Sequence, residues 1–377
     1  MVGANIPSPL YAVYAQRWHF GPAVLTGIFA IYVLFLVPSL LLWGQWSDAH
    51  GRRPALGAGL GFAVLGTVLF LAAQNPWWLF AARAAQGLAV GALSGSATAM
   101  LTDLTPLRRL AALAAGLMTA GGTALGPLLA GVLAQYEPHP LRLAYAVELA
   151  GLLMAVIGLL AIPETRQRRQ GVFKWNPPRV PSAMRAVFWQ SGGAGLVGWS
   201  VTALFMSLVP SYVGALLHVT NLALAGGVVF LMLGCASASQ MILKGIPPRL
   251  SMRWGLVQLI VGLGLLLAAV PTNSLVLVLV STVLAGWGQG MAFLGSMAEV
   301  TQAAPASVRG DVVSSFYVVI YAGVGLSVLG IGAVAQFTGL YSAIAVFTGI
   351  MLMVTLYLLW CLRRDAKTTT PPPLHLL

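Results

Sequence analysis

Long apolar runs separated by short polar stretches make up most of the chain. A helix that crosses a lipid bilayer needs about 20 mostly apolar residues, because its backbone amides must be hydrogen-bonded within the segment. The runs meet this length, and the polar stretches between them fit short connections. They predict eleven membrane-spanning helices, at residues 22–46, 54–74, 77–102, 109–135, 142–162, 186–215, 221–243, 254–271, 274–302, 311–337 and 340–362.

The composition supports a membrane protein and narrows the function classes. Of the residues, 59% are hydrophobic and 7% are charged, and the mean hydropathy is +0.88, whereas soluble domains are about 25% charged. These values exclude a soluble enzyme, a disordered protein and a nucleic-acid-binding domain. Cys235 and Cys361 lie in apolar runs and the five histidines lack zinc-ligand spacing, so we expect no disulfide framework, no metal site and no cofactor.

The basic residues predict the orientation of the chain. Seventeen of the 20 Lys and Arg residues lie at every second junction between the apolar runs. The positive-inside rule places these junctions and the C-terminus in the cytoplasm, so we expect a multi-pass protein of the cell inner (plasma) membrane. The net charge of +12 then reports topology, and we expect no nucleic-acid partner. The basic junctions lie at 52–53, 108–109, 166–185, 244–253, 309 and 363–367.

The two halves of the chain resemble each other at an offset of about 200 residues, and the matches keep their order. Two parallel repeats are typical of one large class of transporters, in which the substrate path lies between the halves near the bilayer midplane. The matches pair Pro9-Leu10-Tyr11 with Pro210-Ser211-Tyr212, Arg53 with Arg253, Gln86-Gly87 with Gln289-Gly290, Pro106 with Pro305, and Ala134-Gln135-Tyr136 with Ala335-Gln336-Phe337.

The repeat also predicts the domain organisation. The helix that precedes Pro210 starts near Arg185, and the same offset puts its counterpart about 16 residues before Met1. We therefore expect an all-α polytopic membrane protein of two pseudo-symmetric six-helix bundles, with eleven full spans and a stub of helix one. The predicted units are an N-terminal bundle at 1–162, a polar, proline-broken cytoplasmic linker at 163–185, a C-terminal bundle at 186–362 and a cytoplasmic tail at 363–377.

A basic turn follows the first apolar run, where residues 44–56 read G-Q-W-S-D-A-H-G-R-R-P-A-L. This segment resembles the signature of the major facilitator superfamily, G-x-L-a-D-r-x-G-r-[RK]-x-x-l, and Trp46 and Ala49 depart from it. The resemblance implies the fold named above and a cytoplasmic gate that the Asp and Arg positions brace in the outward-facing state. The alternative is a basic turn that only sets topology. The predicted gate residues are Gly44, Asp48, Gly51, Arg52 and Arg53, with Asp103 beside them.

Few ionisable residues fall inside the predicted helices. Arg83-Ala84-Ala85-Gln86-Gly87 resembles the family's R-x-x-q-G motif, and Glu148 enters the membrane from the same side. Because a charge inside the membrane is costly, these residues predict an ion pair or a shared proton site. The alternative for Arg83 is extension of its side chain to the membrane surface. Glu299 is a protonatable carboxylate facing the cavity, a partner of Arg309 at the gate, or a side chain exposed at the membrane interface.

Two further groups of residues bear on the transported molecule. Gly122, Gly126, Pro127 and Gly131 resemble the family's antiporter motif, G-x-x-x-G-P-x-x-G-G, with Ala130 replacing one glycine. In the superfamily this motif accompanies proton-driven efflux; the alternative is close packing of small residues. Aromatic and amide side chains gather in 287–321 and either line a substrate site or pack the bundle. The candidates are Trp287, Gln289, Phe316, Tyr317 and Tyr321.

These features predict a secondary active transporter that exports a small amphipathic molecule in exchange for protons. The chain has no Walker loop, no nucleotide fingerprint and no nucleophile–base constellation, so we expect neither an ATPase nor an enzyme. The expected partners are the substrate, protons and the lipid bilayer, and the expected state is a monomer. Two alternatives remain, proton-symport uptake of a metabolite and a membrane sensor that binds a ligand without moving it.

Overall fold

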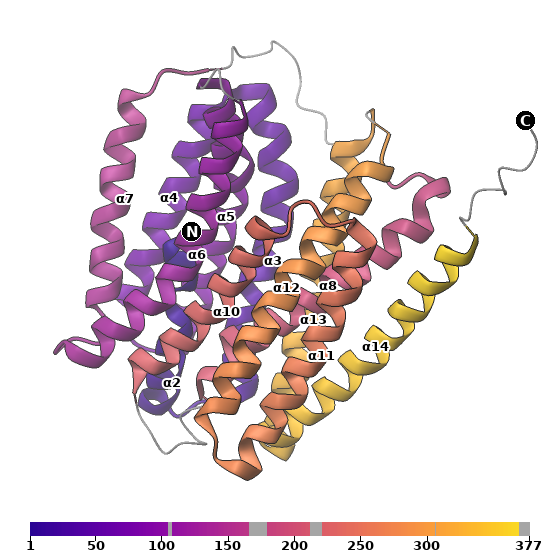
Figure 1. Ribbon diagram of the computed structural model, residues 1–377. Helices are drawn as coiled ribbons and strands as arrows, with labels where there is room; N and C mark the ends of the chain where they lie inside the picture. Colours follow the sequence, from indigo (N-terminus) through magenta and orange to yellow (C-terminus); the bar gives the residue numbers. More distant parts are fainter. Residues whose placement is uncertain (105–107, 166–178, 212–220, 306, 369–377) are drawn as a thin grey trace, which may run out of the picture.

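The computed structural model describes residues 1–104, 108–165, 179–211, 221–305 and 307–368, and its described part is helical without strands (Figure 1). Within these described residues, two short helices open the chain and eleven long ones follow. The helices are α1 (Val2–Asn5), α2 (Pro7–Trp18), α3 (Pro22–His50), α4 (Arg52–Leu71), α5 (Pro76–Leu104), α6 (Arg108–Tyr136), α7 (Leu143–Ala161), α8 (Arg185–Ser207), α10 (Leu222–Ile242), α11 (Pro248–Thr272), α12 (Leu275–Ala303), α13 (Arg309–Thr338) and α14 (Leu340–Thr368), with a 3-10 turn at Ser182–Met184.

The long helices coincide with the eleven predicted apolar ranges. Eight of them, in the described part, are long and apolar enough to cross a membrane. The other three, α5, α6 and α8, contain 29, 29 and 23 residues. Several helices extend beyond the apolar range into polar residues: α3 continues through His50 and α11 begins at Pro248. The helix predicted at 186–215 ends at Ser207. The all-α membrane fold is therefore confirmed.

The internal repeat is confirmed in the arrangement of the helices. Pro22 and Leu222, which begin α3 and α10, are 200 residues apart, and Pro76 and Leu275, which begin α5 and α12, are 199 apart. Packing repeats as well, because α3 with α5, α4 with α5 and α4 with α7 correspond to α10 with α12, α11 with α12 and α11 with α14. In Figure 1 the two sets stand side by side. Residues 166–178 of the predicted linker and 369–377 of the predicted tail lie outside the described residues.

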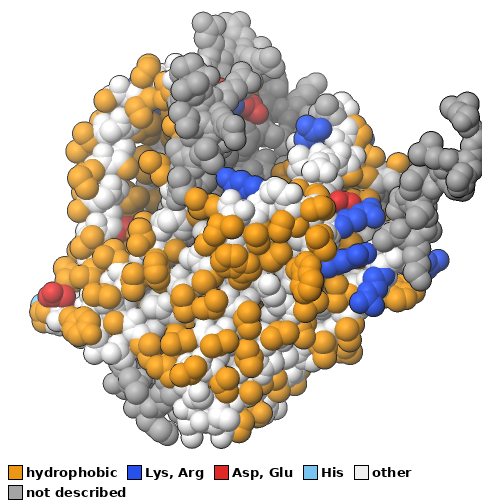
Figure 2. Space-filling model, in the orientation of Figure 1, with side chains coloured by type: hydrophobic (Ala, Val, Ile, Leu, Met, Phe, Trp, Pro, Cys, Tyr) orange, Lys and Arg blue, Asp and Glu red, His pale blue; other side chains and the backbone are white. Residues whose placement is uncertain are grey.

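Basic side chains mark one end of the molecule, here called the basic end. It carries the turn between α3 and α4, the loop between α10 and α11, and the start of α13. On the face in Figure 2, Lys and Arg gather at the upper and right-hand side, while hydrophobic side chains cover the middle and lower part. Outward-facing apolar residues on α7 and α14, such as Met154 (68% exposed) and Met353 (66% exposed), fit contact with lipid.

The two sets of helices contact each other away from the basic end. On α13, Gly332 lies against Thr26 of α3, and the Gln336 side chain accepts a hydrogen bond from the Ala23 amide at 3.5 Å. α6 packs against α10 at the same end of the molecule, where the Gln135 Oε1 accepts a hydrogen bond from the Leu222 amide at 2.7 Å. Since α3, α6, α10 and α13 come from both halves, these pairs form the interface between the bundles.

Close backbone approach explains the small residues in the α6–α10 contact. A Cβ atom on Gly226 would overlap the carbonyl of Pro127, and one on Gly131 would overlap the carbonyl of Leu222. Both helices therefore need glycine at these positions. Such small-residue contacts let membrane helices gain van der Waals packing, the main driving force where lipid is as apolar as the side chains.

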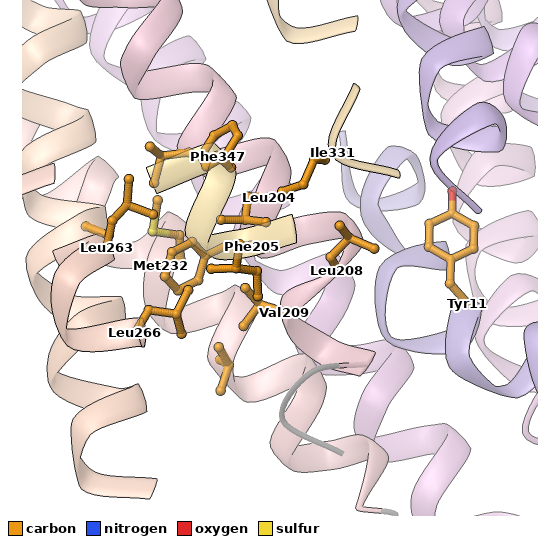
Figure 3. Close-up of a cluster of buried hydrophobic side chains, with 14 of the residues drawn as sticks. Tyr11, Leu204, Phe205, Leu208, Val209, Met232, Leu263, Leu266, Ile331 and Phe347 are labelled. Carbon is orange, nitrogen blue, oxygen red and sulfur yellow. The ribbon is translucent and has the colours of Figure 1, made fainter. Parts of the chain in front are cut away.

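Apolar side chains fill the interior of each bundle. In the second half, Figure 3 shows Phe205 of α8, Met232 of α10, Leu263 of α11 and Phe347 of α14 meeting in one buried cluster. In the first half, α1 and α2 pack against α6, and α1 also touches α5 and α7. Residues 1–18 thus have a place inside the N-terminal bundle, next to the ionisable residues of α5 and α7.

Candidate functional site

The predicted gate residues come together at the basic end. Arg52 begins α4, and its NH2 lies 2.8 Å from the Asp48 Oδ1, while its Nε lies 3.7 Å from the Asp103 Oδ2 at the end of α5. Arg52 NH1 also donates to the Ser47 hydroxyl at 3.2 Å. Gly51 has φ +113°, a conformation that side chains disfavour, so glycine is required at this turn. The turn between α3 and α4 is therefore fixed by charge pairs within the first half of the chain.

Glu164 is a functional candidate that the sequence analysis missed. Its carboxylate accepts hydrogen bonds from the backbone amides of Arg52 at 2.9 Å and Arg53 at 3.0 Å. The Arg53 NH2 in turn donates to the Leu160 carbonyl at 2.9 Å. The acid caps the start of α4, where unpaired amides and the helix dipole favour a negative group. Its position after Pro163, at the end of the last helix of the first half, was the only signal in the sequence.

Glu164→Ala should loosen the start of α4. Loss of the cap removes two amide hydrogen bonds, and caps of this kind contribute about 1 kcal/mol to helix stability. We expect amide hydrogen exchange at Arg52 and Arg53 to rise about fivefold, measured by mass spectrometry on the protein in detergent. Glu137→Ala, which removes an exposed acid after α6, is the matched control. Equal protection of the α4 start in both variants would contradict the capping role.

Arg83 lies buried in the first half, with 2% of its surface exposed. Its NH1 donates to the Ala4 carbonyl and to the Gln86 Oε1, both at 2.8 Å, and Gln86 donates onward to the Gly3 carbonyl at 2.9 Å. The guanidinium carbon sits 4.0 Å from the centre of the Tyr32 ring, a cation–π contact. The side chain therefore does not extend to the membrane surface, and residues of α1 supply its carbonyl partner.

Glu148 of α7 lies on the other side of the same N-terminal segment. Its carboxylate packs against Gly3, beside Thr67, and its Oε2 is buried without a hydrogen-bond partner in the described part of the chain. Among the described residues, Arg83 and Glu148 form no ion pair, because Gly3 and Ala4 lie between them. A shared proton site remains a prediction.

The antiporter-like motif of α6 faces two neighbours. Gly126 approaches the Val2 carbonyl so closely that a Cβ would overlap it, and Gly122 lies near Val2 as well. Pro127 and Gly131 face α10, in the interface between the bundles described above. The motif thus joins α1 on one side and the second bundle on the other, as close packing requires.

Glu299 does not pair with Arg309, which corrects one of the two sequence expectations. The Glu299 Oε1 lies 2.8 Å from the Arg249 Nε, so its partner comes from α11. Arg309 donates instead to the Ala304 carbonyl at 3.4 Å. The arginine at the start of α11 reaches the end of α12 because these helices pack together throughout, a contact that sequence order alone does not give.

Part of the predicted aromatic group gathers on α12 and α13. Tyr317 and Tyr321 stack at 6.1 Å between ring centres, and Phe293 lies 6.4 Å from both Tyr317 and Phe316. Trp199 of α8 completes the group at 5.8 Å from Phe293 and 6.2 Å from Tyr321; the sequence analysis missed both Phe293 and Trp199. These five residues (Trp199, Phe293, Phe316, Tyr317 and Tyr321) are called the aromatic cluster below. Trp199 lies in the middle of an apolar run, so nothing in the surrounding sequence indicates this role.

The other two candidates for substrate lining are on α12 as well. Gln289 is 2% exposed and packs beside Gly198, inside the second bundle. Trp287 is partly exposed and has no ring contact with the aromatic cluster among the described residues. Neither residue therefore gains support from the geometry as part of the same surface.

Comparison with known sequences identifies the family. The sequence model described as "Major Facilitator Superfamily" matches residues 1–257, more than half of the chain. The chain belongs to this superfamily. Its members' two-bundle architecture agrees with the repeat and the interface described above.

Two curated relatives are bacterial resistance proteins. The puromycin resistance protein pur8 of Streptomyces alboniger is 36% identical over 148 residues, which cover 38% of this chain and 28% of the relative. The multidrug resistance protein MdtG of Proteus mirabilis is 30% identical over 164 residues, which cover 41% of this chain and 40% of the relative. The matched regions thus span less than half of either relative.

A solved structure shares the fold along almost the whole chain. It is a bacterial homologue of the human lysosomal transporter Spinster, in an inward-facing and unoccupied conformation. The TM-score is 0.79 at 14% identity, and the match covers 98% of this chain and 95% of the other. At this identity the likeness supports the fold alone.

Proposed function

We propose that this superfamily member exports a small amphipathic molecule in exchange for protons, by alternating access between its two bundles. The observation that carries the proposal is the half-buried Glu148, whose Oε2 is buried without a hydrogen-bond partner in the described part of the chain, separated by Gly3 and Ala4 from the buried guanidinium of Arg83. Ionisable groups inside membrane helices are costly and mark ion pathways in transporters. Glu148 is the protonatable group in this proposal, and Gly3, Ala4 and Arg83 connect it to the bundle interface through Tyr32.

The direction of transport rests on two further features. The α6 motif with Gly122, Gly126, Pro127 and Gly131 resembles that of the proton-driven exporters of the superfamily, and both curated relatives are named for drug resistance. In the proposed cycle, the basic end faces the cytoplasm in the inner membrane. The bundle contacts away from that end then hold the outer side closed, and the turn with Asp48 and Arg52 closes the inner side in the alternate state.

The proposal is tested in proteoliposomes that contain the purified chain and a pH-sensitive dye. Two aromatic probes are used, the cationic puromycin and the anionic 1-naphthoate. An imposed proton gradient should drive a transported probe against its concentration gradient, and that probe added without a gradient should move protons in the opposite direction. Movement of protons and probe in the same direction would favour symport. Binding of a probe without any flux would favour the sensor.

The role of the turn is tested in the same vesicles with the double variant Asp48→Asn/Arg52→Gln. It removes the charge pair at the basic end but leaves Glu148 and the aromatic cluster in place. We expect slower transport with binding of the probe retained, because the turn closes the inner side in the proposal. Unchanged transport would show that the turn only sets topology.

A further inference from the structure

The aromatic cluster contains a hydrogen-bond donor without an acceptor. The indole Nε1 of Trp199 is buried and has no hydrogen-bond partner among the described residues. An indole N–H can only donate, and a buried donor left unpaired costs about 1–3 kcal/mol. The Trp199, Tyr317 and Tyr321 side chains keep part of their surface exposed although they lie in the middle of long helices. A ligand lying against these rings could supply the missing acceptor.

Arg83 adds positive charge on the opposite side of the bundle interface. Its guanidinium stacks on Tyr32, and Tyr32 and Tyr321 pack against the same set of buried side chains although they come from different bundles. The Arg83 Nε has no hydrogen-bond partner in the described part of the chain. One bundle thus offers the unpaired N–H of Trp199, and the other offers the positive charge of Arg83.

The carboxylates in the described part of the chain lie elsewhere. An organic cation placed against these rings would lose its hydration without gaining a counter-charge, and Arg83 would repel it. Aromatic rings alone attract cations by about 0.5–2 kcal/mol, and here Arg83 already occupies the face of Tyr32. The described acids are at the basic end (Asp48, Asp103, Glu164, Glu299 and Asp311), after α6 (Glu137) and against Gly3 (Glu148).

We propose that the aromatic cluster and Arg83 select aromatic substrates that carry an anionic or neutral hydrogen-bond acceptor, and discriminate against organic cations. The substrate ring packs on Tyr317 and Tyr321, and its carboxylate or carbonyl oxygen accepts a hydrogen bond from the N–H at the edge of the Trp199 ring. This inference rests on the proposed transport function and specifies its substrate class. It can be tested separately from transport, because selectivity is a property of binding and needs no proton gradient.

Three probes with the same ring system test the inference: 1-naphthoate, 1-naphthamide and 1-naphthylmethylammonium. Their dissociation constants are measured by isothermal titration calorimetry on the full chain in nanodiscs. We expect naphthoate and naphthamide to bind at least about tenfold more tightly than the ammonium probe, because only they supply an acceptor and avoid repulsion by Arg83. Equal or tighter binding of the ammonium probe would overturn the inference, as would no binding of the first two at millimolar concentration.

Trp199→Phe keeps the ring and removes the N–H. It should weaken naphthoate and naphthamide about two- to tenfold and leave the ammonium probe unchanged. Trp189→Phe is the matched control, since Trp189 lies on the same helix but is 60% exposed at the outer surface. Equal weakening of all three probes by Trp199→Phe would indicate a packing role and overturn the assignment of the donor. Selective binding without proton-driven flux would contradict the proposed function and leave the inference standing.

Discussion

Glu148→Gln should abolish proton-driven transport while the substrate still binds. Glutamine keeps the size and polarity of the side chain next to Gly3 and Thr67 but cannot release or take up a proton. If Glu148 carries the coupled proton, flux driven by a pH gradient falls to the level of empty vesicles. Exchange of labelled for unlabelled substrate, which needs no net proton movement, persists. Both rates are measured in the same proteoliposomes.

Glu137→Gln is the control for this prediction, because Glu137 is an exposed acid in the loop after α6. It should transport like the unmodified chain. A Glu148→Gln variant that still accumulates substrate at the expense of a proton gradient would rule out Glu148 as the coupling group. Glu299 would then be the remaining candidate for proton coupling among the residues predicted from the sequence, although its pairing with Arg249 at 2.8 Å favours a structural role.

Gly226→Leu should stop transport by changing which state the protein occupies. Any Cβ at this position overlaps the Pro127 carbonyl, and a backbone atom cannot rotate away as a side chain can. Overpacking of this kind costs about 1–3 kcal/mol, which corresponds to a roughly 5- to 150-fold shift between two states. The contact between α6 and α10 should open, and accessibility at this interface should rise while the other state becomes dominant.

The neighbouring Gly227 provides the matched control. No atom lies within 4 Å of a Cβ placed there, so Gly227→Leu adds the same side chain to the same helix without a clash. Thiol labelling of a cysteine introduced at Leu222, in a background without Cys235 and Cys361, measures the opening. Equal labelling and equal transport in the two leucine variants would show that the close approach at Gly226 has no functional weight.

The helices could be predicted from the sequence because the bilayer imposes their length and apolar character. The repeat added the pairing of the two halves, visible in Pro22 and Leu222. The charge group around Arg52 could also be predicted, since Asp48 is four residues away in the same turn and Asp103 is near the end of a neighbouring helix. These contacts are local or follow from a motif whose residues share one loop.

Other contacts depend on tertiary packing that no local pattern encodes. Glu164 caps α4 from more than 100 residues away, and Arg249 replaces Arg309 as the partner of Glu299 because α11 packs along α12. Trp199 resembles any other aromatic residue in an apolar run until α8, α12 and α13 come together. Periodicity identifies which residues lie in a helix, but it does not identify the helix that each side chain meets.

The relative motion of the two bundles tests the account most directly. Spin labels at Ala161 and Gln302 report the distance between the bundles at the basic end, and labels at Gln74 and Thr272 report it at the other end; all four residues are exposed. Double electron–electron resonance measures both distances with and without substrate at high and low pH. The account predicts that the two distances change in opposite directions, one shortening as the other lengthens. Transport that proceeds while both distances stay fixed, or change together, would contradict it.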